Sequence, residues 1–358
     1  MNNTLSRNNT VTIAKAIGIV LVVMAHAMNP EWISWKVIYT FHMPLFFLLS
    51  GYCFNEKYLD DARLFFVRKI KGIYVPFVVY SLVFLSLHNV FCKWHVLEAD
   101  SVFGWRDFVW VVGRIVTRMS HDECLLGTFW FLKELFLGNV FFYIVLRLLK
   151  RNKTMTVVVL FLITVLFVIT GWRIPYFGIG KTTFYASTFI AFGCFCREYI
   201  SAFRKWWCYV VAIASVAIYI SCFDHVAMGG QTIVTLVPYT VCALGGSLVV
   251  FAISDRLNGI FHSEAALCIG GVQFVGNQTL KIMALHFLSF KLVTFLLIKV
   301  YALPIDRLVA HPVMMEYSEK GWWLLYTLTG VALPLLFAKM SEIVLQFIQK
   351  CYGNRKPR

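Results

Sequence analysis

The strongest constraint on this chain is a series of long apolar blocks that recurs along most of its length. The blocks run to about 17 to 23 residues, the length that an α-helix needs to cross a ~30 Å hydrocarbon layer. Of the 358 residues, 59% are hydrophobic and only 14% are charged, whereas soluble domains carry roughly a quarter charged residues. The sequence therefore predicts an all-α fold, a polytopic bundle of membrane helices.

About ten transmembrane helices are expected. Their approximate positions are 11–28, 37–54, 74–92, 127–149, 155–171, 182–197, 206–223, 232–253, 277–298 and 321–349. The connections contain no Ser/Gly-rich linker and no clear repeat, so we predict a single membrane-embedded domain over 1–358, with short cytoplasmic tails at about 1–10 and 350–358. The ten cysteines fall mostly inside apolar runs, which is typical of small buried hydrophobic residues rather than metal ligands.

Lysine and arginine are enriched in the connections that would lie on the same side as the N-terminus, which places both termini in the cytoplasm. This enrichment also accounts for the net charge of +15, and no basic soluble segment suggests a nucleic-acid partner. Residues 1–27 alternatively resemble a secretory signal that ends at Ala25-His26-Ala27. The nine spans that follow favour an uncleaved first helix.

The first expected helix carries two ionisable residues, Lys15 and His26. Eleven residues correspond to three helical turns and about 20°, so both side chains lie on one face, about 16 Å apart along the axis. Ionisable groups inside membrane spans are costly, and functional roles are their default interpretation. In the alternative, Lys15 extends to the lipid head groups and His26 only marks the end of the helix.

The second expected helix contains His42, Pro44 and the pair Ser50-Gly51. His42 lies in the same outer zone as His26, and two imidazoles there could perform acid–base chemistry near neutral pH. Pro44 frees backbone carbonyls, which membranes tolerate where protein or a watery cavity satisfies them. Ser50-Gly51 permits close contact between helices. His42 could instead form a hydrogen bond within the bundle.

Weaker candidates are polar, basic or aromatic residues near helix ends or at mid-membrane. They are Arg68, Lys69 and Lys71 before Tyr74 and Pro76; Trp130 and Glu134, one turn apart; Asp224 and His225 in an outer loop; and His286 with Thr279 on its face. The basic residues could equally reflect ordinary membrane topology, and Glu134 could pair with a lysine. The long loop from about 93 to 126 predicts an amphipathic helix at the membrane interface. His88, His95, His121, His262 and His311 have no supporting context.

Several of these elements together resemble the acyltransferase 3 family. They are the Lys15-x10-His26 spacing, the string from His42 to Tyr52, Trp130-Phe131-Leu132, and the segment from Gly276-Asn277-Gln278-Thr279-Leu280 to His286. The resemblance extends over residues 11–345. The family usually has arginine where this chain has Lys15, and lysine keeps the charge without the bidentate geometry.

The resemblance implies an O-acyltransferase that moves an acetyl group from acetyl-CoA to a hydroxyl of a glycan or cell-envelope precursor, with no metal. His26 matches the catalytic histidine, as a general base or as an acyl carrier. His42, Glu134 and His286 are expected to line the catalytic cavity. Lys15, Arg68, Lys69 and Lys71 are expected to bind coenzyme A, and Trp130, Asp224 and His225 to face the acceptor.

The expected location is the bacterial inner membrane, where the partners would be membrane lipids and a glycan or lipid-linked saccharide. Association into a homo-oligomer is left open. A proton-coupled transporter or lipid-linked glycan flippase is the alternative function, because intramembrane His, Lys and Glu residues also relay protons. That alternative predicts inverted repeats, which the sequence lacks. A membrane receptor or scaffold would leave Lys15 and His26 without a joint role.

Overall fold

The computed structural model describes residues 9–120, 123–199, 205–224, 226–264 and 266–353. Within these ranges the chain is helical, and the extended pairing is limited to one isolated bridge between Ile174 and Ile179. The α-helices are α1 (Asn9–Ala27), α2 (Ile33–Tyr52), α3 (Ala62–Lys69), α4 (Val75–Lys93), α5 (Trp105–Arg118), α6 (Trp130–Leu148), α7 (Lys153–Thr170), α8 (Lys181–Tyr199), α9 (Trp206–Cys222), α10 (Ile233–Glu264), α11 (Ala266–Asn277), α12 (Thr279–Val300), α13 (Met315–Tyr317) and α14 (Trp323–Gly353).

Short 3-10 and π segments connect these helices. The 3-10 segments are η1 (Glu56–Leu59), η3 (Ala99–Ser101), η4 (Cys124–Phe129), η6 (Met228–Gly230) and η7 (Ile305–Val309), and the π segments are η2 (Ile70–Tyr74) and η8 (Ser318–Trp322).

The predicted membrane helix bundle is confirmed, since each of the ten expected spans coincides with a helix. Eight helical segments of the described chain are long and apolar enough to cross a membrane. The helix α9 is apolar but shorter, at 17 residues. The loop after the third span contains the expected helix, α5, which buries Val111 and Ile115. The helix α11 was not predicted, because Gly270 and Gly271 interrupt its apolar pattern.

The third span is longer than expected, because α3 continues through the π turn η2 into α4 as one segment from Ala62 to Lys93. Pro76 stands just after the π turn. It has no amide proton, so an α-helical hydrogen bond to the carbonyl of Gly72 cannot form. A wider turn accommodates this missing bond. The π turn brings the basic stretch around Lys69 to the start of a membrane helix.

Two glycines allow α2 and α8 to pack backbone against backbone. A Cβ atom on Gly51 would lie 1.8 Å from the carbonyl oxygen of Ile190, and one on Gly193 would lie 1.9 Å from that of Leu48. Neither position tolerates a side chain at this helix separation. The close contact predicted from Ser50-Gly51 is therefore confirmed, and Ser50 also bonds Asn139 of α6 at 3.1 Å.

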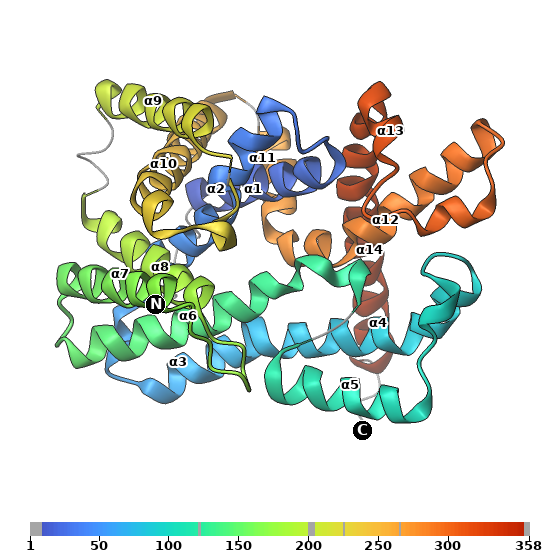
Figure 1. Ribbon diagram of the computed structural model, residues 1–358, viewed down its shortest axis with the longest axis horizontal. Coiled ribbons are helices and arrows are strands. Elements are labelled where there is room, and N and C mark those ends of the chain that lie inside the picture. Colours follow the sequence, from blue (N-terminus) through green and yellow to red (C-terminus); the bar gives the residue numbers. More distant parts are fainter. Residues whose placement is uncertain (1–8, 121–122, 200–204, 225, 265, 354–358) are drawn as a thin grey trace.

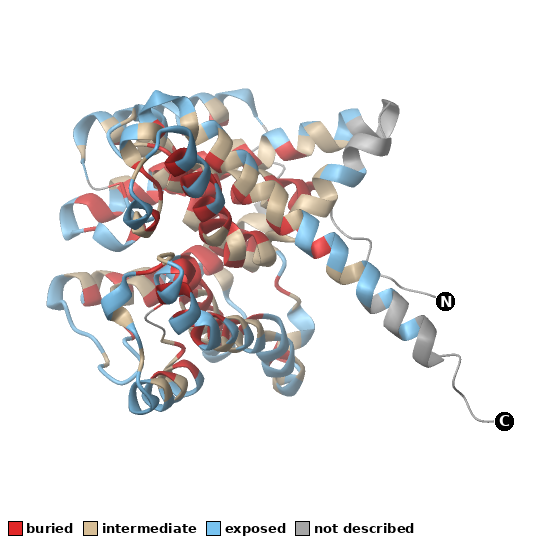
Figure 2. Ribbon diagram, turned by 90° about the vertical axis from the view of Figure 1, so that its right-hand side faces the viewer, coloured by how far each residue is buried: buried red, intermediate tan, exposed pale blue. Residues whose placement is uncertain are grey.

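The helix α1 lies at the centre of the bundle, in contact with α2, α10, α11, α12 and α14 (Figure 1). Buried residues gather on the sides of the helices that face one another, and exposed residues cover the outside (Figure 2). Of the segments long enough to span a membrane, α1 and α12 are the most enclosed. The helix that carries Lys15 and His26 is therefore surrounded by protein.

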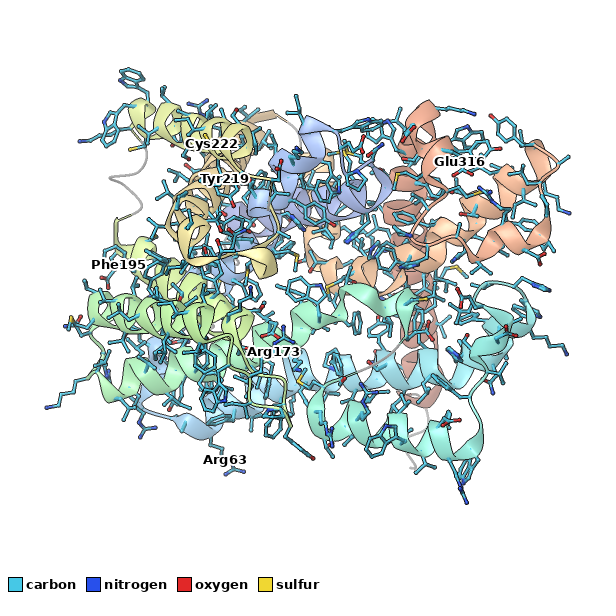
Figure 3. All side chains as sticks on the ribbon, in the orientation of Figure 1. Arg63, Arg173, Phe195, Tyr219, Cys222 and Glu316 are labelled. Carbon is cyan, nitrogen blue, oxygen red and sulfur yellow. The ribbon has the colours of Figure 1, made fainter. Side chains whose placement is uncertain are left out.

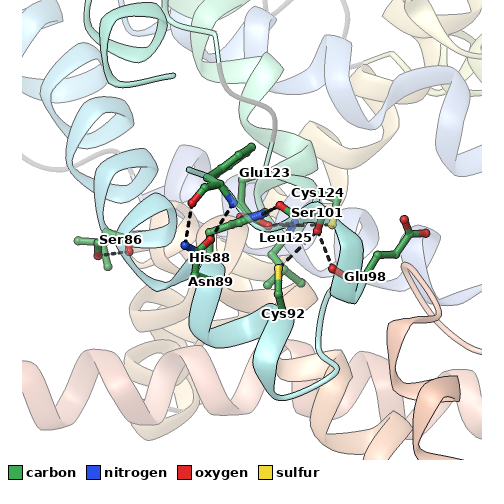
Figure 4. Close-up of polar contacts among 11 residues, drawn as sticks. Ser86, His88, Asn89, Cys92, Glu98, Ser101, Glu123, Cys124 and Leu125 are labelled. Carbon is green, nitrogen blue, oxygen red and sulfur yellow. Dashed lines mark hydrogen bonds and ion pairs between the residues drawn. The ribbon is translucent and has the colours of Figure 1, made fainter. Parts of the chain in front are cut away.

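A compact polar cluster joins α4 to the connections on either side of α5. His88 contacts the Glu123 carboxylate through Nδ1 at 2.8 Å and the Ser101 carbonyl through Nε2 at 2.7 Å (Figure 4). The ring stacks on Phe103 with centroids 4.2 Å apart, and Asn89 bonds both backbone polar groups of Phe103. We call His88, Ser101 and Glu123 the His88 cluster. It fixes the start of η4, whose Thr128 reaches α12.

Candidate functional site

A cavity of about 440 Å³ runs beside α1, between α2, η2, η4, α6, η6 and α12. Lys15 and His26 both line it. Because they lie about 16 Å apart along α1, they mark two separate regions. We call the region of Lys15, Cys53 and Lys69 the lysine end, and the region of His26, Tyr39 and His42 the histidine end.

The lysine end presents two ammonium groups. Lys15 and Lys69 line the cavity from α1 and from the end of α3, and the described lining contains no aspartate or glutamate. Both lysines lie near the thiol of Cys53, just after α2. Desolvation raises the pKa of the Cys53 thiol, and the charges of Lys15 and Lys69 oppose that rise. This end of the cavity is suited to bind an anionic group.

The histidine end is built from two adjacent helices. His42 is buried, and its Nδ1 contacts the carbonyl of Ile38 one turn earlier at 2.9 Å. Since a carbonyl only accepts, Nδ1 is the donor and Nε2 remains free to act as an acceptor or base. The ring of Tyr39 lies 4.7 Å from that of His42 and 6.5 Å from that of His26. Two imidazoles and a phenol therefore share this region.

His286 lies directly behind His26, on the central helix α12. Its side chain is fully buried, and the centroids of the two imidazoles are 5.3 Å apart. Phe287 contacts both rings, at 5.0 Å from His26 and 4.1 Å from His286. His286 does not line the cavity, but α12 contributes Met283 to the wall.

Some of the other predicted site residues line the cavity, and the rest lie outside it. Trp130 lines the cavity. Glu134 is buried but does not line it, because its carboxylate interacts with Thr183 of α8 and with the charges of Lys133 and Arg173. The loop that carries Arg173 lies beside α6 and α8 (Figure 3).

Arg68 and Lys71 are exposed outside the cavity, so Lys69 is the member of that basic stretch which faces it. Asp224 is exposed and pairs with Lys36 at 3.8 Å, although the next segment reaches the cavity through Gly229. His225 lies outside the described residues.

Several lining residues were missed from the sequence. Tyr39 precedes His42 by three positions, so helical spacing alone indicated a shared face. Cys53 follows the Ser50-Gly51 contact at the end of α2 and lines the cavity as an exposed residue. Thr128 gave no signal, since it depends on the hydrogen bond between its hydroxyl and the Met283 carbonyl at 3.2 Å. Gly229 likewise reaches the cavity only through the path of its loop.

A buried cation on α12 supports the segment beside the histidine end. Lys291 is 4% exposed, and its ammonium donates to the carbonyls of Leu308, Val309 and Ala310 at 2.9–3.1 Å. The next residue, His311, packs its ring 4.7 Å from that of Phe287. Burial lowers the pKa of His311 to about 4, and the charge of Lys291 acts in the same direction. His311 was not among the predicted site residues.

The arrangement combines anion binding with acid–base chemistry in one enclosed space. An elongated ligand with a negative charge at the lysine end would place its other end near His26. Neutral imidazoles there can take a proton from an attacking hydroxyl. Among the described residues, no three His, Cys, Asp or Glu side chains are close enough to hold a metal ion.

Comparison with known proteins gives one match. A family model described as an acyltransferase domain matches residues 8–339, nearly the whole chain. No curated protein matches the chain, and no solved structure matches it.

Proposed function

The chain belongs to the acyltransferase 3 family, and from this premise we propose that it transfers an acetyl group from acetyl-CoA to a glycan hydroxyl. The family and the membrane helices make it a membrane acyltransferase. The proposed acceptor is a glycan or another cell-envelope precursor, which includes a lipid-linked saccharide. The proposed location is the bacterial inner membrane, with both termini in the cytoplasm.

One observation carries the choice of donor: a single cavity joins Lys15 and Lys69 to His26. Coenzyme A is elongated, with phosphates near one end and the thioester at the other. Phosphates at the lysine end would form charge-assisted hydrogen bonds, and the thioester would then reach the histidine end. No carboxylate in the described lining competes for the two ammonium groups.

In the proposed reaction, His26 acts as the general base. It accepts the proton of the acceptor hydroxyl while the oxygen attacks the thioester carbonyl carbon. The C–S bond then breaks, and the leaving thiolate takes the proton from His26. His42, with its free Nε2, would bind or orient the hydroxyl. The aromatic surfaces of Tyr39 and Trp130 in the lining suit the apolar face of a sugar ring.

The cysteines provide a direct test of donor binding. Cys53 is exposed and lines the lysine end, whereas Cys222 is exposed at the end of α9 and does not line the cavity (Figure 3). Acetyl-CoA should slow maleimide labelling of Cys53 in nanodiscs, measured by mass spectrometry of the labelled peptides, and should leave Cys222 unaffected. Equal labelling of Cys53 with and without acetyl-CoA would contradict binding of acetyl-CoA at the lysine end. It would favour the alternative function of a transporter.

Turnover separates the two roles considered for histidine. Wild-type protein with acetyl-CoA and soluble glycan fragments should release free CoA and acetylated sugar. Rapid quenching without acceptor tests for acetyl-histidine on the peptide that contains His26. An acetylated His26 that forms and decays at the rate of turnover would replace the general-base step with an acyl-enzyme.

A further inference from the structure

The tautomer of His286 is fixed by its own helix. Its Nδ1 contacts the carbonyl oxygens of Ile282 at 3.1 Å and Met283 at 2.9 Å. Both are acceptors only, so Nδ1 must carry the hydrogen. In a neutral imidazole the other nitrogen is then an acceptor. His286 therefore offers a lone pair at Nε2.

Two buried polar atoms near each other lack partners. The Nε2 atom of His286 and the Nδ1 atom of His26 are both buried without a hydrogen bond. The carbonyl of Val22, one turn earlier on α1, influences the His26 ring, but the pair lies outside hydrogen-bonding geometry. Buried polar groups are normally paired, so two orphan atoms on neighbouring rings require an explanation.

The two orphans are chemically complementary. Nε2 of His286 can only accept, and Nδ1 of His26 can donate in one of its two tautomers. The rings are already adjacent, with centroids 5.3 Å apart and planes inclined by 38°. His26 also lines the cavity while its Nδ1 is buried. The edge of the ring that faces the cavity is therefore the one that carries Nε2.

We propose that His26 and His286 form an imidazole dyad, in which Nδ1–H of His26 donates to Nε2 of His286 during turnover. This proposal rests on the proposed function, because it assigns how the base of that reaction is held. The hydrogen bond fixes the His26 tautomer in which Nε2, on the cavity side, is the base. His286 takes no proton and touches no substrate, so it is a positioning residue.

Among the described residues, the other acceptors near His26 are the Val22 carbonyl and Nε2 of His42, and neither forms a hydrogen bond with Nδ1 of His26. A catalytic histidine is commonly oriented by a carboxylate, but no carboxylate lines the cavity in the described chain. The titratable groups facing His26 are His42, Tyr39, His286 and His311. Tyr39 is the more distant of the ring neighbours.

The dyad has a consequence during the reaction. When His26 accepts the hydroxyl proton at Nε2, the ring becomes positive and its Nδ1–H becomes a stronger donor. The hydrogen bond to His286 then strengthens, which stabilises the protonated base until the thiolate takes the proton back. Phe287 and Phe290 border His286, so little water is available to substitute for it.

The test compares His286→Phe, which removes the acceptor, with His286→Asn, which keeps one, in full-length protein in nanodiscs. His286→Phe should lower kcat for CoA release about 10²-fold with little change in KM for acetyl-CoA. Its kcat/KM–pH profile should shift its acid limb to lower pH, because protonated His26 loses its partner. His286→Asn should retain more activity, and added imidazole should partly restore His286→Ala.

Labelling of Cys53 with and without acetyl-CoA shows that each variant still folds and binds donor. His95→Gln, at a half-buried histidine of the loop after α4 that contacts Asp306, controls for loss of a histidine outside the cavity. Unchanged kcat and pH profile in His286→Phe would overturn the dyad and leave the proposed function standing, provided that His26→Ala is inactive. Equal losses in all three His286 variants, without imidazole rescue, would make His286 structural and also overturn it. A wild-type protein that binds acetyl-CoA without releasing CoA would overturn the proposed function, and the dyad with it.

Discussion

The His88 cluster and the histidine end of the cavity differ in how the ring nitrogens of their buried imidazoles are hydrogen-bonded. Both nitrogens of His88 have partners, the Glu123 carboxylate at Nδ1 and the Ser101 carbonyl at Nε2. At the histidine end, His26 and His286 each leave a buried ring nitrogen without a partner. A satisfied network stabilises one structure, whereas unpaired groups remain available for chemistry. Hydrogen-bond satisfaction, rather than burial, separates the two sets of histidines.

The largest effect is expected from removing the base. His26→Ala should lower the rate of CoA release about 10³-fold, because general base catalysis typically contributes 10²–10⁴. The melting temperature should change little, since this ring contributes no hydrogen bond that the fold requires. Protection of Cys53 by acetyl-CoA should persist. Activity within twofold of the wild type would show that the unsatisfied histidine is not the base.

Changes in the His88 cluster should lower the stability of the protein and leave its turnover nearly unchanged. Glu123→Ala leaves His88 buried without its carboxylate, and loss of one partner of a buried pair costs about 3 kcal/mol. The expected result is a lower melting temperature in detergent, with kcat per folded molecule within a few-fold of the wild type. The double variant His88→Phe/Glu123→Leu should recover part of the lost stability, because both members of the buried pair are then replaced by apolar side chains. Recovery should be incomplete, because the Ser101 carbonyl and the Leu125 amide each lose a partner. A large loss of kcat at unchanged stability would contradict a purely structural role for the His88 cluster.

The two ends of the cavity should differ in which kinetic constant responds. Lys15→Ala should raise KM for acetyl-CoA about tenfold, since a charge-assisted hydrogen bond contributes about 1.5 kcal/mol. Its kcat should remain near that of the wild type, and Lys15→Arg should bind donor at least as well. Steady-state kinetics measure both constants, with the exposed Lys299→Ala as the control. A fall in kcat without a change in KM would contradict a donor role for Lys15.

The smallest effect is expected where a satisfied carboxylate is exposed. A hydrogen bond from Lys153 holds the pKa of Glu56 below its ordinary value, and the charge of Lys153 adds to this. Because the folded pKa is lowered, the stabilisation is present above the ordinary glutamate range and disappears as the pH falls through the folded pKa. The side chain is 49% exposed, so the gain is about 0.5 kcal/mol or less.

Melting curves at pH 7 and pH 4 would measure this gain. Glu56→Gln should lower the melting temperature slightly at pH 7. It should also reduce the difference between the melting temperatures measured at pH 7 and at pH 4. A destabilisation as large as that of Glu123→Ala would show that burial does not separate the two carboxylates.

Relations within one helix were readable from the sequence. The apolar blocks predicted the membrane helices, and a spacing of eleven residues put Lys15 and His26 on one face, along which the cavity runs. The Ser50-Gly51 pair predicted a close helix contact, which Gly51 makes with Ile190. Such features follow from the 100° rotation per residue and from side-chain size, both of which are local properties.

Relations between helices were decided by the tertiary structure. Glu134 was expected in the cavity, but the packing of α6 against α8 directs its carboxylate to Thr183. His88 had no supporting context in the sequence, because its partner Glu123 is 35 residues further along the chain and only folding brings the two together. His286 became a neighbour of His26 because α12 packs against α1. The sequence by itself determined which side chains share a helix face, and only helix packing decided which faces meet, because that depends on contacts between distant segments.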